Sequence, residues 1–551
     1  MRYLFLLILI SLVPLRSLLH PGMFISHDSE LHVARLASFY KSFTEGNLFP
    51  RWGANFNNNL GNPTLMFLYP LPNYFGLPFI ALGFSFIDTV KILFALGFIL
   101  SGIFMFLLLS EIFSQKTAFA GSLIYLFSPY RFVDIFVRGA LPEHLFLMLA
   151  PLSLFLLIKY YQKPTKLKFV ISSIFLSSLT LVHIASSVFY LPFIYILLLI
   201  IFLNKKRKYK FIYDLIVLAL PFIISILLTL FYWFPAVVEG KYTLRRLIIN
   251  KQFSASHLVD LKQLIIPRWG FGDPRISDGF STQIGIINLL ILSVLITLFI
   301  LKKMRVDKLT LYLFVIYFVC IFLMTKYSKF IWLSNDILFN IHFPWRLLVL
   351  IVIINAFFGT ILFQKLLKFK NIYLVNIAIV VLTFGVLLTT KDYHKPQGYF
   401  SKNDNYYLKD YVSFADNGES LPIWTTLDVQ STHKYPLEII EGQAQITNVL
   451  RESELHKYLV MVEKDGTNFL ENTLYFPGWN VYDNGVNITQ MIEYQDPNYK
   501  GLITFRLPYG RHEITVKFEN TRVREMAKLV SLIGLLLLLL PLKVHILGYE
   551  Q

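Results

Sequence analysis

Apolar residues in this chain are gathered into long blocks, each close to the length of a helix that crosses a bilayer. A hydrocarbon core about 30 Å thick requires about 20 apolar residues per helix, and 55% of the 551 residues are hydrophobic. The pattern predicts an α-helical polytopic membrane protein with about twelve transmembrane helices. We expect them at residues 3–20, 89–110, 117–136, 141–160, 168–185, 187–203, 211–233, 284–301, 309–325, 345–364, 372–390 and 525–543.

The net charge of +17 comes largely from short basic loops between these blocks, such as Lys205–Lys208 and the group Lys302, Lys303 and Arg305. Lysine and arginine in short loops mark the cytoplasmic side of a membrane, so the charge predicts orientation rather than nucleic-acid binding. Both termini are then cytoplasmic, in the plasma or inner cell membrane. Counting 71–86 as a span would put the basic loops on alternating sides, so we interpret that segment as re-entrant or interfacial.

Residues 391–524 differ from the rest, because their apolar runs are short and alternate with polar residues. Asn484-Gly485 is a hairpin signal, and 503–507 and 513–517 are typical of strands. The single cysteine excludes an intrachain disulfide there. The predicted organisation is a transmembrane domain at 1–390 with a first outer loop at 21–88, a β-rich extracytoplasmic domain at 391–524, and a last helix with a cytoplasmic tail at 525–551.

Four ionisable residues, His27, Asp28, Glu30 and His32, follow directly after the first apolar block. A carboxylate at the membrane interface can deprotonate an acceptor hydroxyl, so Asp28 is the candidate catalytic base, with His27 and Glu30 expected to orient it or to bind acceptor. His32 and Arg35 lie near it on one helical face and are candidates for binding or orienting the acceptor. Two alternatives stay open: a helix N-cap with a solvated first turn, and a divalent metal site, the one cofactor that these residues leave possible.

Arginines at the outer ends of the predicted spans form a second set of candidates, namely Arg131, Arg138 and Arg346. A guanidinium group binds two phosphate oxygens at once and stays charged, which suits the phosphate of a lipid. The alternatives are an Arg138–Glu143 or Arg131–Asp134 ion pair that braces two helices, and an interfacial anchor at Arg346. Further candidates are Lys91 for the phosphate, and Glu143, His183 and Glu239 for orienting the acceptor.

The order of several short motifs carries a resemblance to a known family. They are His27-Asp28, Phe49-Pro50-Arg51-Trp52, Tyr69-Pro70-Leu71-Pro72, Ser128-Pro129-Tyr130-Arg131, Arg138-Gly139-Ala140-Leu141-Pro142-Glu143 and Phe343-Pro344-Trp345-Arg346. In this order they resemble the multi-pass proteins labelled "6-pyruvoyl-tetrahydropterin synthase-related", which are similar to the YfhO-like branch of the GT-C glycosyltransferases.

The resemblance implies a GT-C fold in which the first outer loop supplies a catalytic aspartate, here Asp28. It also implies a polyprenyl-phosphate-linked sugar, a hexose or pentose, as donor and an extracytoplasmic glycan, lipid or protein as acceptor. The sequence lacks a second acidic pair of the oligosaccharyltransferase kind. The alternative function is a transporter or flippase of lipid-linked glycans, although we detect no clear internal repeat of the kind common in transporters.

Overall fold

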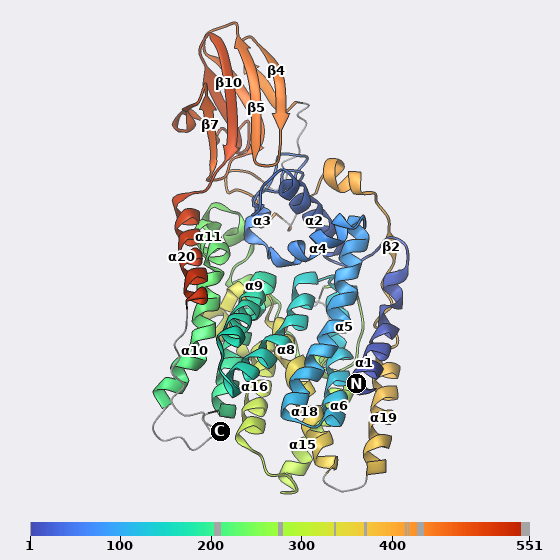
Figure 1. Cartoon of the computed structure of the whole chain (residues 1–551). Helices are drawn as coiled ribbons and strands as arrows, with labels where there is room; N and C mark the ends of the chain where they lie inside the picture. The colour runs from blue at the N-terminus through green and yellow to red at the C-terminus, as the bar shows by residue number, and fades with distance from the viewer. Residues whose placement is uncertain are drawn as a thin grey trace.

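The computed structural model describes residues 2–202, 211–273, 279–335, 338–367, 372–413, 416, 418–426 and 435–540. It shows a helical bundle with a β-rich region stacked on one of its ends (Figure 1). The predicted basic loop Lys205–Lys208 and the chain after residue 540, which includes the predicted tail, lie outside the described residues.

Among the described residues, eleven helices of ten or more residues before the β-rich region build the bundle, not counting the two such helices in the first outer loop. Side chains on every face of α8 and α18 are buried, which identifies these two as central helices. The eleven are α1 (Arg2–Leu12), α5 (Phe86–Ile112), α6 (Gln115–Leu126), α8 (Leu141–Gln162), α9 (Lys166–Phe202), α10 (Phe211–Leu228), α11 (Leu230–Glu239), α15 (Ile286–Ile300), α16 (Lys308–Met324), α18 (Leu348–Leu367) and α19 (Ile372–Thr390), and α20 (Arg522–Leu539) follows the β-rich region.

Short helices connect these elements and form much of the end that carries the β-rich region. In the first outer loop α2 (Ser29–Thr44) and α3 (Thr64–Phe67) precede α4 (Leu71–Ala81). The others are η1 (Val13–Leu19), α7 (Pro129–Phe132), η2 (Val133–Val137), η3 (Gly240–Tyr242), α12 (Arg245–Ile248), α13 (Lys251–Ser256), α14 (Leu261–Ile265), η4 (Lys326–Ser328), α17 (Lys329–Ser334), η5 (Leu338–Ile341), η6 (Pro344–Leu347), η7 (Tyr406–Asp410) and η8 (Thr489–Met491).

Helix α4 covers most of the segment 71–86 and is too short to cross a membrane. At 1.5 Å per residue it is about 16 Å long, roughly half of a bilayer core. It packs against α2 and α5 at the end of the bundle. The segment therefore does not cross the membrane as a helix.

Six of the described helices are long and apolar enough to cross a membrane, or seven if the bent pair α10–α11 is one span. The chain is thus a multi-pass helical membrane protein, but this count does not reach the predicted twelve. The predicted span 117–136 is broken at Pro129, which disfavours helix in the residue before it and opens α7. Helices α15 and α16 are shorter apolar helices, and α20 carries Arg522, Arg524, Glu525 and Lys528 in its first half.

Helix α9 is one of the six candidate spans, although its chain reverses direction within it. Its backbone leaves the helical region at His183, with φ −163° and ψ 89°. The ring of Phe169 lies 5.9 Å from that of Tyr160, and the ring of Phe202 lies 4.8 Å from that of Tyr161. Both ends of α9 therefore meet the same end of α8, and the chain turns back at His183, where two spans were predicted to meet.

The β-rich region holds two antiparallel sheets, with strand orders β4-β5-β10-β7-β8 and β3-β6-β9, whose apolar faces share one core. The hairpin predicted at Asn484-Gly485 is present, because Asp483 pairs with Val486 across these two positive-φ residues. The strands are β3 (Leu437–Glu441), β4 (Ala444–Arg451), β5 (Leu455–Val462), β6 (Thr467–Leu474), β7 (Trp479–Asp483), β8 (Val486–Asn487), β9 (Leu502–Leu507) and β10 (Gly510–Phe518); β1 (Met23–Phe24) pairs separately with β2 (Tyr399–Phe400).

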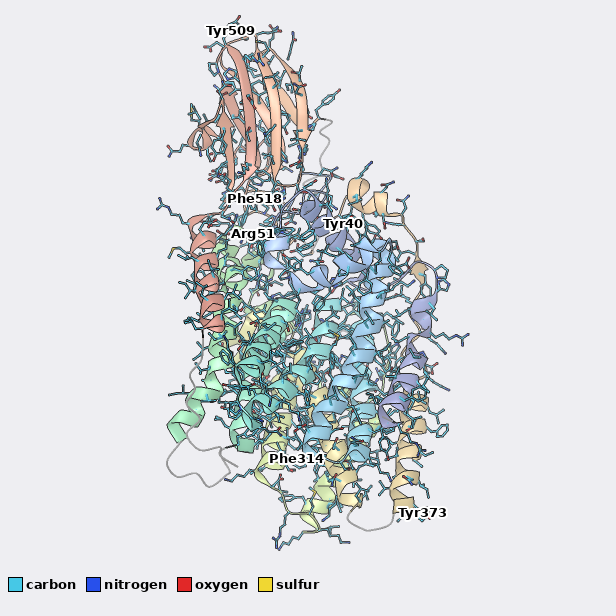
Figure 2. The ribbon with its side chains drawn as sticks, in the orientation of Figure 1. Tyr40, Arg51, Phe314, Tyr373, Tyr509 and Phe518 are labelled. Carbon is cyan, nitrogen blue, oxygen red and sulfur yellow. The ribbon has the colours of Figure 1, made fainter. Side chains whose placement is uncertain are left out.

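The first outer loop joins the sheets to the bundle. Figure 2 shows Arg51 and Phe518 at this junction, far from Tyr509 at the tip of the sheets. The indole of Trp52 packs edge-on against that of Trp479 at 5.2 Å. The backbone N–H of Arg51 donates to Glu454 over 3.0 Å. Polar and aromatic contacts together fix the β-rich region on the loop that begins with the candidate site.

Candidate functional site

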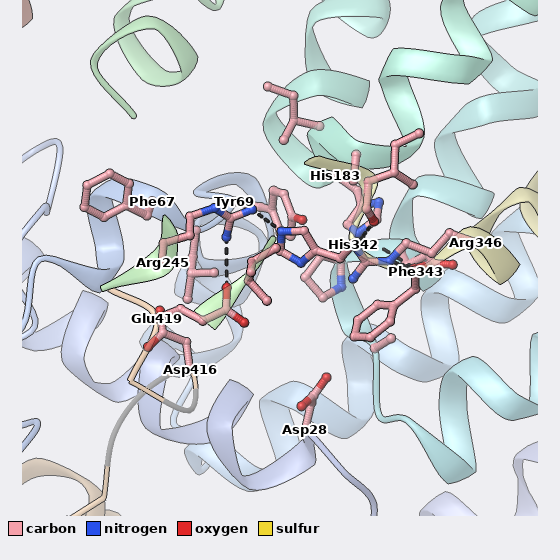
Figure 3. Close-up of a pocket in the computed structure, with 18 of the residues that line it drawn as sticks. Asp28, Phe67, Tyr69, His183, Arg245, His342, Phe343, Arg346, Asp416 and Glu419 are labelled. Atoms are coloured by element: carbon pink, nitrogen blue, oxygen red, sulfur yellow. Dashed lines mark hydrogen bonds and ion pairs between the residues drawn. The ribbon is translucent and has the colours of Figure 1, made fainter. Parts of the chain in front are cut away.

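A cavity of about 1450 Å³ lies at the end of the bundle that carries the β-rich region. Its walls come from the start of α2, the turn between η2 and α8, the bend of α9, the segment after α11, the turn before α18 and the residues near 416–420 (Figure 3). Elements that are far apart in the sequence therefore converge on one charged chamber.

Asp28 lines this cavity from the residue just before α2. Its backbone N–H donates to the carbonyl of Arg138 over 2.8 Å, and the N–H of His27 donates to Val137 over 3.0 Å. Its side chain makes no capping hydrogen bond, because the hydroxyl of Ser26 accepts from the N–H of Ser29 instead. Among the described residues, the Asp28 carboxylate has no hydrogen bond or ion pair, and it points into the cavity (Figure 3). A role as helix N-cap therefore does not explain the position of the Asp28 carboxylate.

Two of its sequence neighbours line the cavity with it, and one does not. His27 contacts the carbonyl of Phe271 through Nε2 at 2.7 Å. His32 is buried in the wall, and burial followed by the charge of Arg35 lowers its pKa well below the usual value, so it is neutral at physiological pH. Glu30 instead pairs with Lys402 at 2.9 Å and is not part of the cavity wall.

Glu143 is the centre of a buried ionic cluster on another wall. Its Oε2 lies 3.1 Å from Nη1 of Arg138, 3.4 Å from Nε of Arg346 and 3.8 Å from Nε2 of His183, and its Oε1 accepts from the hydroxyl of Tyr130. Four predicted residues are thus brought together from four elements: Arg138 at the end of η2, Glu143 in α8, His183 in α9 and Arg346 in η6.

Aromatic rings hold the two guanidinium groups of this cluster. Arg138 lies 4.5 Å from the ring centre of Trp345, and Arg346 lies 4.9 Å from that of Phe343. Arg138 also pairs with Asp134 at 2.5 Å. Burial lowers the pKa of Arg138, but the charge of Glu143 outweighs burial and leaves that pKa above the usual value, so the guanidinium group is charged. The Arg138–Glu143 brace that the sequence left open is therefore present, and it faces the cavity.

Three other predicted residues lie away from the cavity wall. Lys91 donates to the carbonyl of His20 over 2.7 Å. Arg131 donates to Ser101 over 2.7 Å, with its guanidinium near the rings of Phe98 and Tyr125. Glu239 pairs with Arg524 of α20 at 2.9 Å. Each charge is used to hold helices together, which the sequence alone does not distinguish from a ligand contact.

The cavity also contains ionisable residues that sequence reasoning missed, chiefly Arg245, His342 and Glu419. Nη1 of Arg245 lies 2.9 Å from Oε2 of Glu419, and its other terminal nitrogen contacts Nε2 of His342. The only signal in the sequence was the basic pair Arg245-Arg246 after a broken apolar block.

Among the described residues, no group of three or more His, Cys, Asp or Glu side chains is placed to hold a metal ion. The set proposed from the sequence does not form, because Glu30 turns to Lys402 and His27 to a carbonyl. The described residues at this position therefore do not form a site for a divalent cation.

These features define a multi-pass helical membrane protein with a β-rich C-terminal region and a charged cavity at the end of the bundle that carries this region. No family model matches the chain, and no curated protein sequence matches it. Its structure is similar to the cryo-EM structure of arabinofuranosyltransferase AftD from Mycobacteria, with a TM-score of 0.42 and 13% sequence identity over 72% of this chain. The chain covers 27% of that protein.

Proposed function

We propose that this chain is a membrane glycosyltransferase that moves a sugar from a polyprenyl-phosphate donor to an extracytoplasmic acceptor. The observation that carries the proposal is the Asp28 carboxylate, which points into the same cavity as the Arg138 and Arg346 guanidinium groups. A base and a phosphate-binding group facing one chamber are the two parts that a displacement at a sugar phosphate requires.

In the proposed reaction, Asp28 accepts the proton of an acceptor hydroxyl, and the acceptor oxygen bonds to the anomeric carbon. The bond from that carbon to the phosphate oxygen breaks, and the phosphate leaves with the electron pair. Arg346 and Arg138 bind the negative charge that develops on it. The acceptor oxygen attacks the anomeric carbon from the side opposite the phosphate, so this single displacement inverts the configuration of the sugar.

Glu143 would position the two arginines rather than touch the donor. It is buried, and its ion pairs with Arg138 and Arg346 restrict both guanidinium groups. His183 accepts from the Ser186 N–H through Nδ1, so its Nε2 proton is directed at the same carboxylate. Such preorganisation lowers the cost of aligning charge with the leaving group.

The proposal places the cavity and residues 391–524 on the outer side of the cell membrane, with both termini in the cytoplasm. It is supported by the connection between α15 and α16, which contains Lys302, Lys303 and Arg305 and lies at the end of the bundle opposite the sheets (Figure 1). Basic connections of this kind favour the cytoplasmic side.

The test is to reconstitute purified protein into vesicles with extracted envelope acceptors and a panel of labelled hexoses and pentoses, linked to polyprenyl monophosphate or polyprenyl diphosphate. We expect transfer of label to an acceptor and release of the polyprenyl mono- or diphosphate. Movement of the intact lipid between leaflets without cleavage would contradict the proposal and indicate a transporter of lipid-linked glycans.

A further inference from the structure

A second pair of opposite charges lines the cavity, separate from the Glu143 cluster. Arg245 begins α12, and its Nη1 lies 2.9 Å from Oε2 of Glu419. The backbone N–H of Leu244 donates to the carbonyl of Leu421 over 2.8 Å. The two segments are thus joined through their main chains, and the place of Arg245 in the wall does not depend on its ion pair alone.

His342 lies between this arginine and Arg346 (Figure 3). A guanidinium group has only donors, so the Nε2 atom that contacts Arg245 must accept and the imidazole is neutral. Burial, followed by the charges of Arg245 and Arg346, lowers the pKa of His342 well below its usual value, in agreement with that assignment. His342 has φ +66°, a left-handed conformation that is unfavourable outside glycine and is concentrated at ligand sites.

The cavity is larger than one phosphate and one sugar require. Its volume of about 1450 Å³ exceeds the roughly 300–1,000 Å³ that is usual for small-ligand sites. Arg138 and Arg346 share Glu143 as their carboxylate, whereas Arg245 has Glu419, and its side chain is 35% exposed. When a lipid phosphate is bound at Arg346, Arg245 can therefore bind a second anion in exchange for its contact with Glu419.

We propose that Arg245 is a second phosphoryl-binding residue beside Arg346, that it is positioned by His342, and that the lipid ligand accordingly carries a diphosphate. Glu419 is the counter-ion that the second phosphoryl group displaces. The inference rests on the proposed function and narrows it, since it assigns the lipid headgroup to the same cavity: the donor is a polyprenyl-diphosphate-linked sugar, and polyprenyl diphosphate is the leaving group.

Protonation of Glu419 supports such an exchange. Burial raises its pKa to about 7, and the charge of Arg245 acts in the opposite direction. A neutral Glu419 no longer competes for Arg245, and a bound phosphate disfavours its ionised form. Ligand binding should therefore take up a proton, and affinity should rise as pH falls through about 7. The other charged or titratable groups that act on Glu419 or respond to it are Asp416, Arg346, Arg35 and Tyr69.

The experiment measures binding of a polyprenyl monophosphate and a polyprenyl diphosphate to the purified full-length protein in detergent. Arg245→Gln should weaken the diphosphate by about tenfold or more, the loss expected for a charge-assisted contact, and leave the monophosphate little changed. Arg346→Gln should weaken both lipids. Arg506→Gln, on an exposed position of β9, is the matched control and should change neither.

Glu419→Gln should tighten diphosphate binding and abolish the extra gain in affinity that the wild type shows between about pH 8 and pH 6. Comparing the two proteins at each pH removes the titration of the lipid phosphate itself. If Arg245→Gln does not fold, Arg245→Lys replaces it. Lysine keeps the charge without the planar fork, so it should lose part of the diphosphate affinity.

If Arg245→Gln changes the affinity for both lipids equally, or changes neither, Arg245 has only a structural role. If Glu419→Gln weakens diphosphate binding, Glu419 likewise has only a structural role. If Arg346→Gln still weakens the monophosphate in that case, only the diphosphate inference fails. If the wild type binds neither lipid, the proposed function fails with it.

Discussion

At the scale of single residues, Asp28 is placed by the backbone around it rather than by contacts of its own side chain. Its N–H bonds to the carbonyl of Arg138, and the next residue, Gly139, has φ +64°. A Cβ atom on Gly139 would lie 2.2 Å from Oγ of Ser26 and 2.8 Å from the backbone N of Ser29. The loop that carries Asp28 approaches the Arg138 turn closely only because this position is glycine.

Gly139→Ala should therefore push the 26–29 loop away and reduce turnover by about tenfold to a hundredfold, since about 1 Å of misplacement has an effect of that order. The measurement is sugar transfer by purified variants at matched protein concentration. Gly83→Ala is the control, because Gly83 has φ +91° but nothing within 4 Å of its Cβ position. Equal activity of the two variants would show that the close approach does not matter.

Part of this site could be predicted from the sequence. Charged residues at the ends of apolar blocks are expensive unless they are used, which identified Asp28, Arg138, Glu143 and Arg346. The same reasoning selected Arg131, whose charge is instead held inside the core beside Ser101. The contacts of Arg245 depend on which loops meet across the bundle, and no local pattern contains that information.

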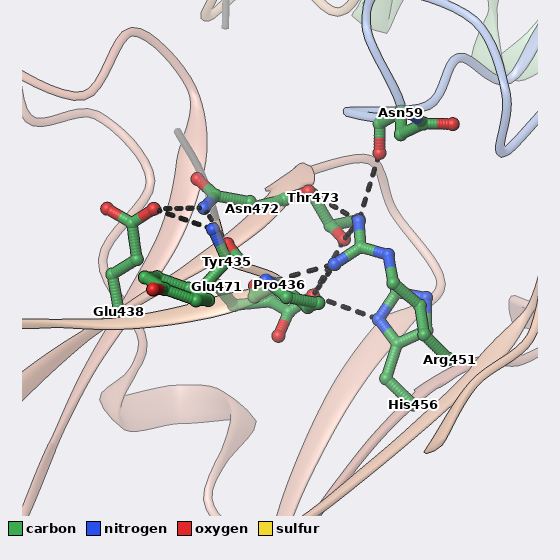
Figure 4. Close-up of polar contacts among 9 residues, drawn as sticks. All are labelled: Asn59, Tyr435, Pro436, Glu438, Arg451, His456, Glu471, Asn472 and Thr473. Carbon is green, nitrogen blue, oxygen red and sulfur yellow. Dashed lines mark hydrogen bonds and ion pairs between the residues drawn. The ribbon is translucent and has the colours of Figure 1, made fainter. Parts of the chain in front are cut away.

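At the scale of elements, the β4–β5 hairpin holds the first outer loop through one arginine. Arg451 donates to the carbonyl of Asn59 over 3.0 Å and lies 3.3 Å from Glu471, which is fully buried (Figure 4). His456 contacts the same carboxylate at 2.9 Å. A single cluster therefore ties β4, β5 and β6 to a loop of the helical part.

Arg451→Gln should lower the free energy of unfolding of the β-rich region by about 1–3 kcal/mol, because it removes a charged partner from a buried carboxylate. Thermal unfolding followed by tryptophan fluorescence is the measurement, since Trp52 and Trp479 pack at the junction. The exposed Arg506→Gln serves as the control. If both variants unfold at the same temperature as the wild type, the contacts of Arg451 do not stabilise the β-rich region.

Long apolar blocks in the sequence predict most of the helices, but they do not predict where a helix is broken or bent. The hairpin at Asn484-Gly485 was predictable because turn chemistry is local. The bend of the α10–α11 pair by 60° depends on packing in the bundle instead. The predicted domain boundaries at residues 390 and 524 stay predictions.

At the scale of the whole molecule, helix α2, whose start lines the cavity, lies with the sheets at one end of the bundle, and the α15–α16 connection lies at the other (Figure 1). A bilayer around the apolar helices would separate these two ends. The proposed reaction requires the end of the bundle that carries the sheets to face outward, because the donor and the acceptor are proposed to meet there.

A cysteine at Glu441, an exposed position of β3, should react with a membrane-impermeant thiol reagent in intact cells. The background is Cys320→Ser, which removes the buried native thiol. A cysteine at the exposed Lys303 is the matched control and should react only after the membrane is permeabilised. The reverse pattern would overturn the proposed orientation.

The most direct test of the account is sugar transfer by the Asp28→Asn variant. Asparagine keeps the size of the side chain but does not accept the acceptor's proton, so turnover should fall by about two to four orders of magnitude. Because the carboxylate has no hydrogen bond or ion pair among the described residues, the melting temperature should not change. Asp392→Asn, an exposed carboxylate paired with Lys395, is the control and should keep wild-type turnover. Wild-type turnover in Asp28→Asn, or loss of activity and stability together, would contradict the assignment of Asp28 as the base.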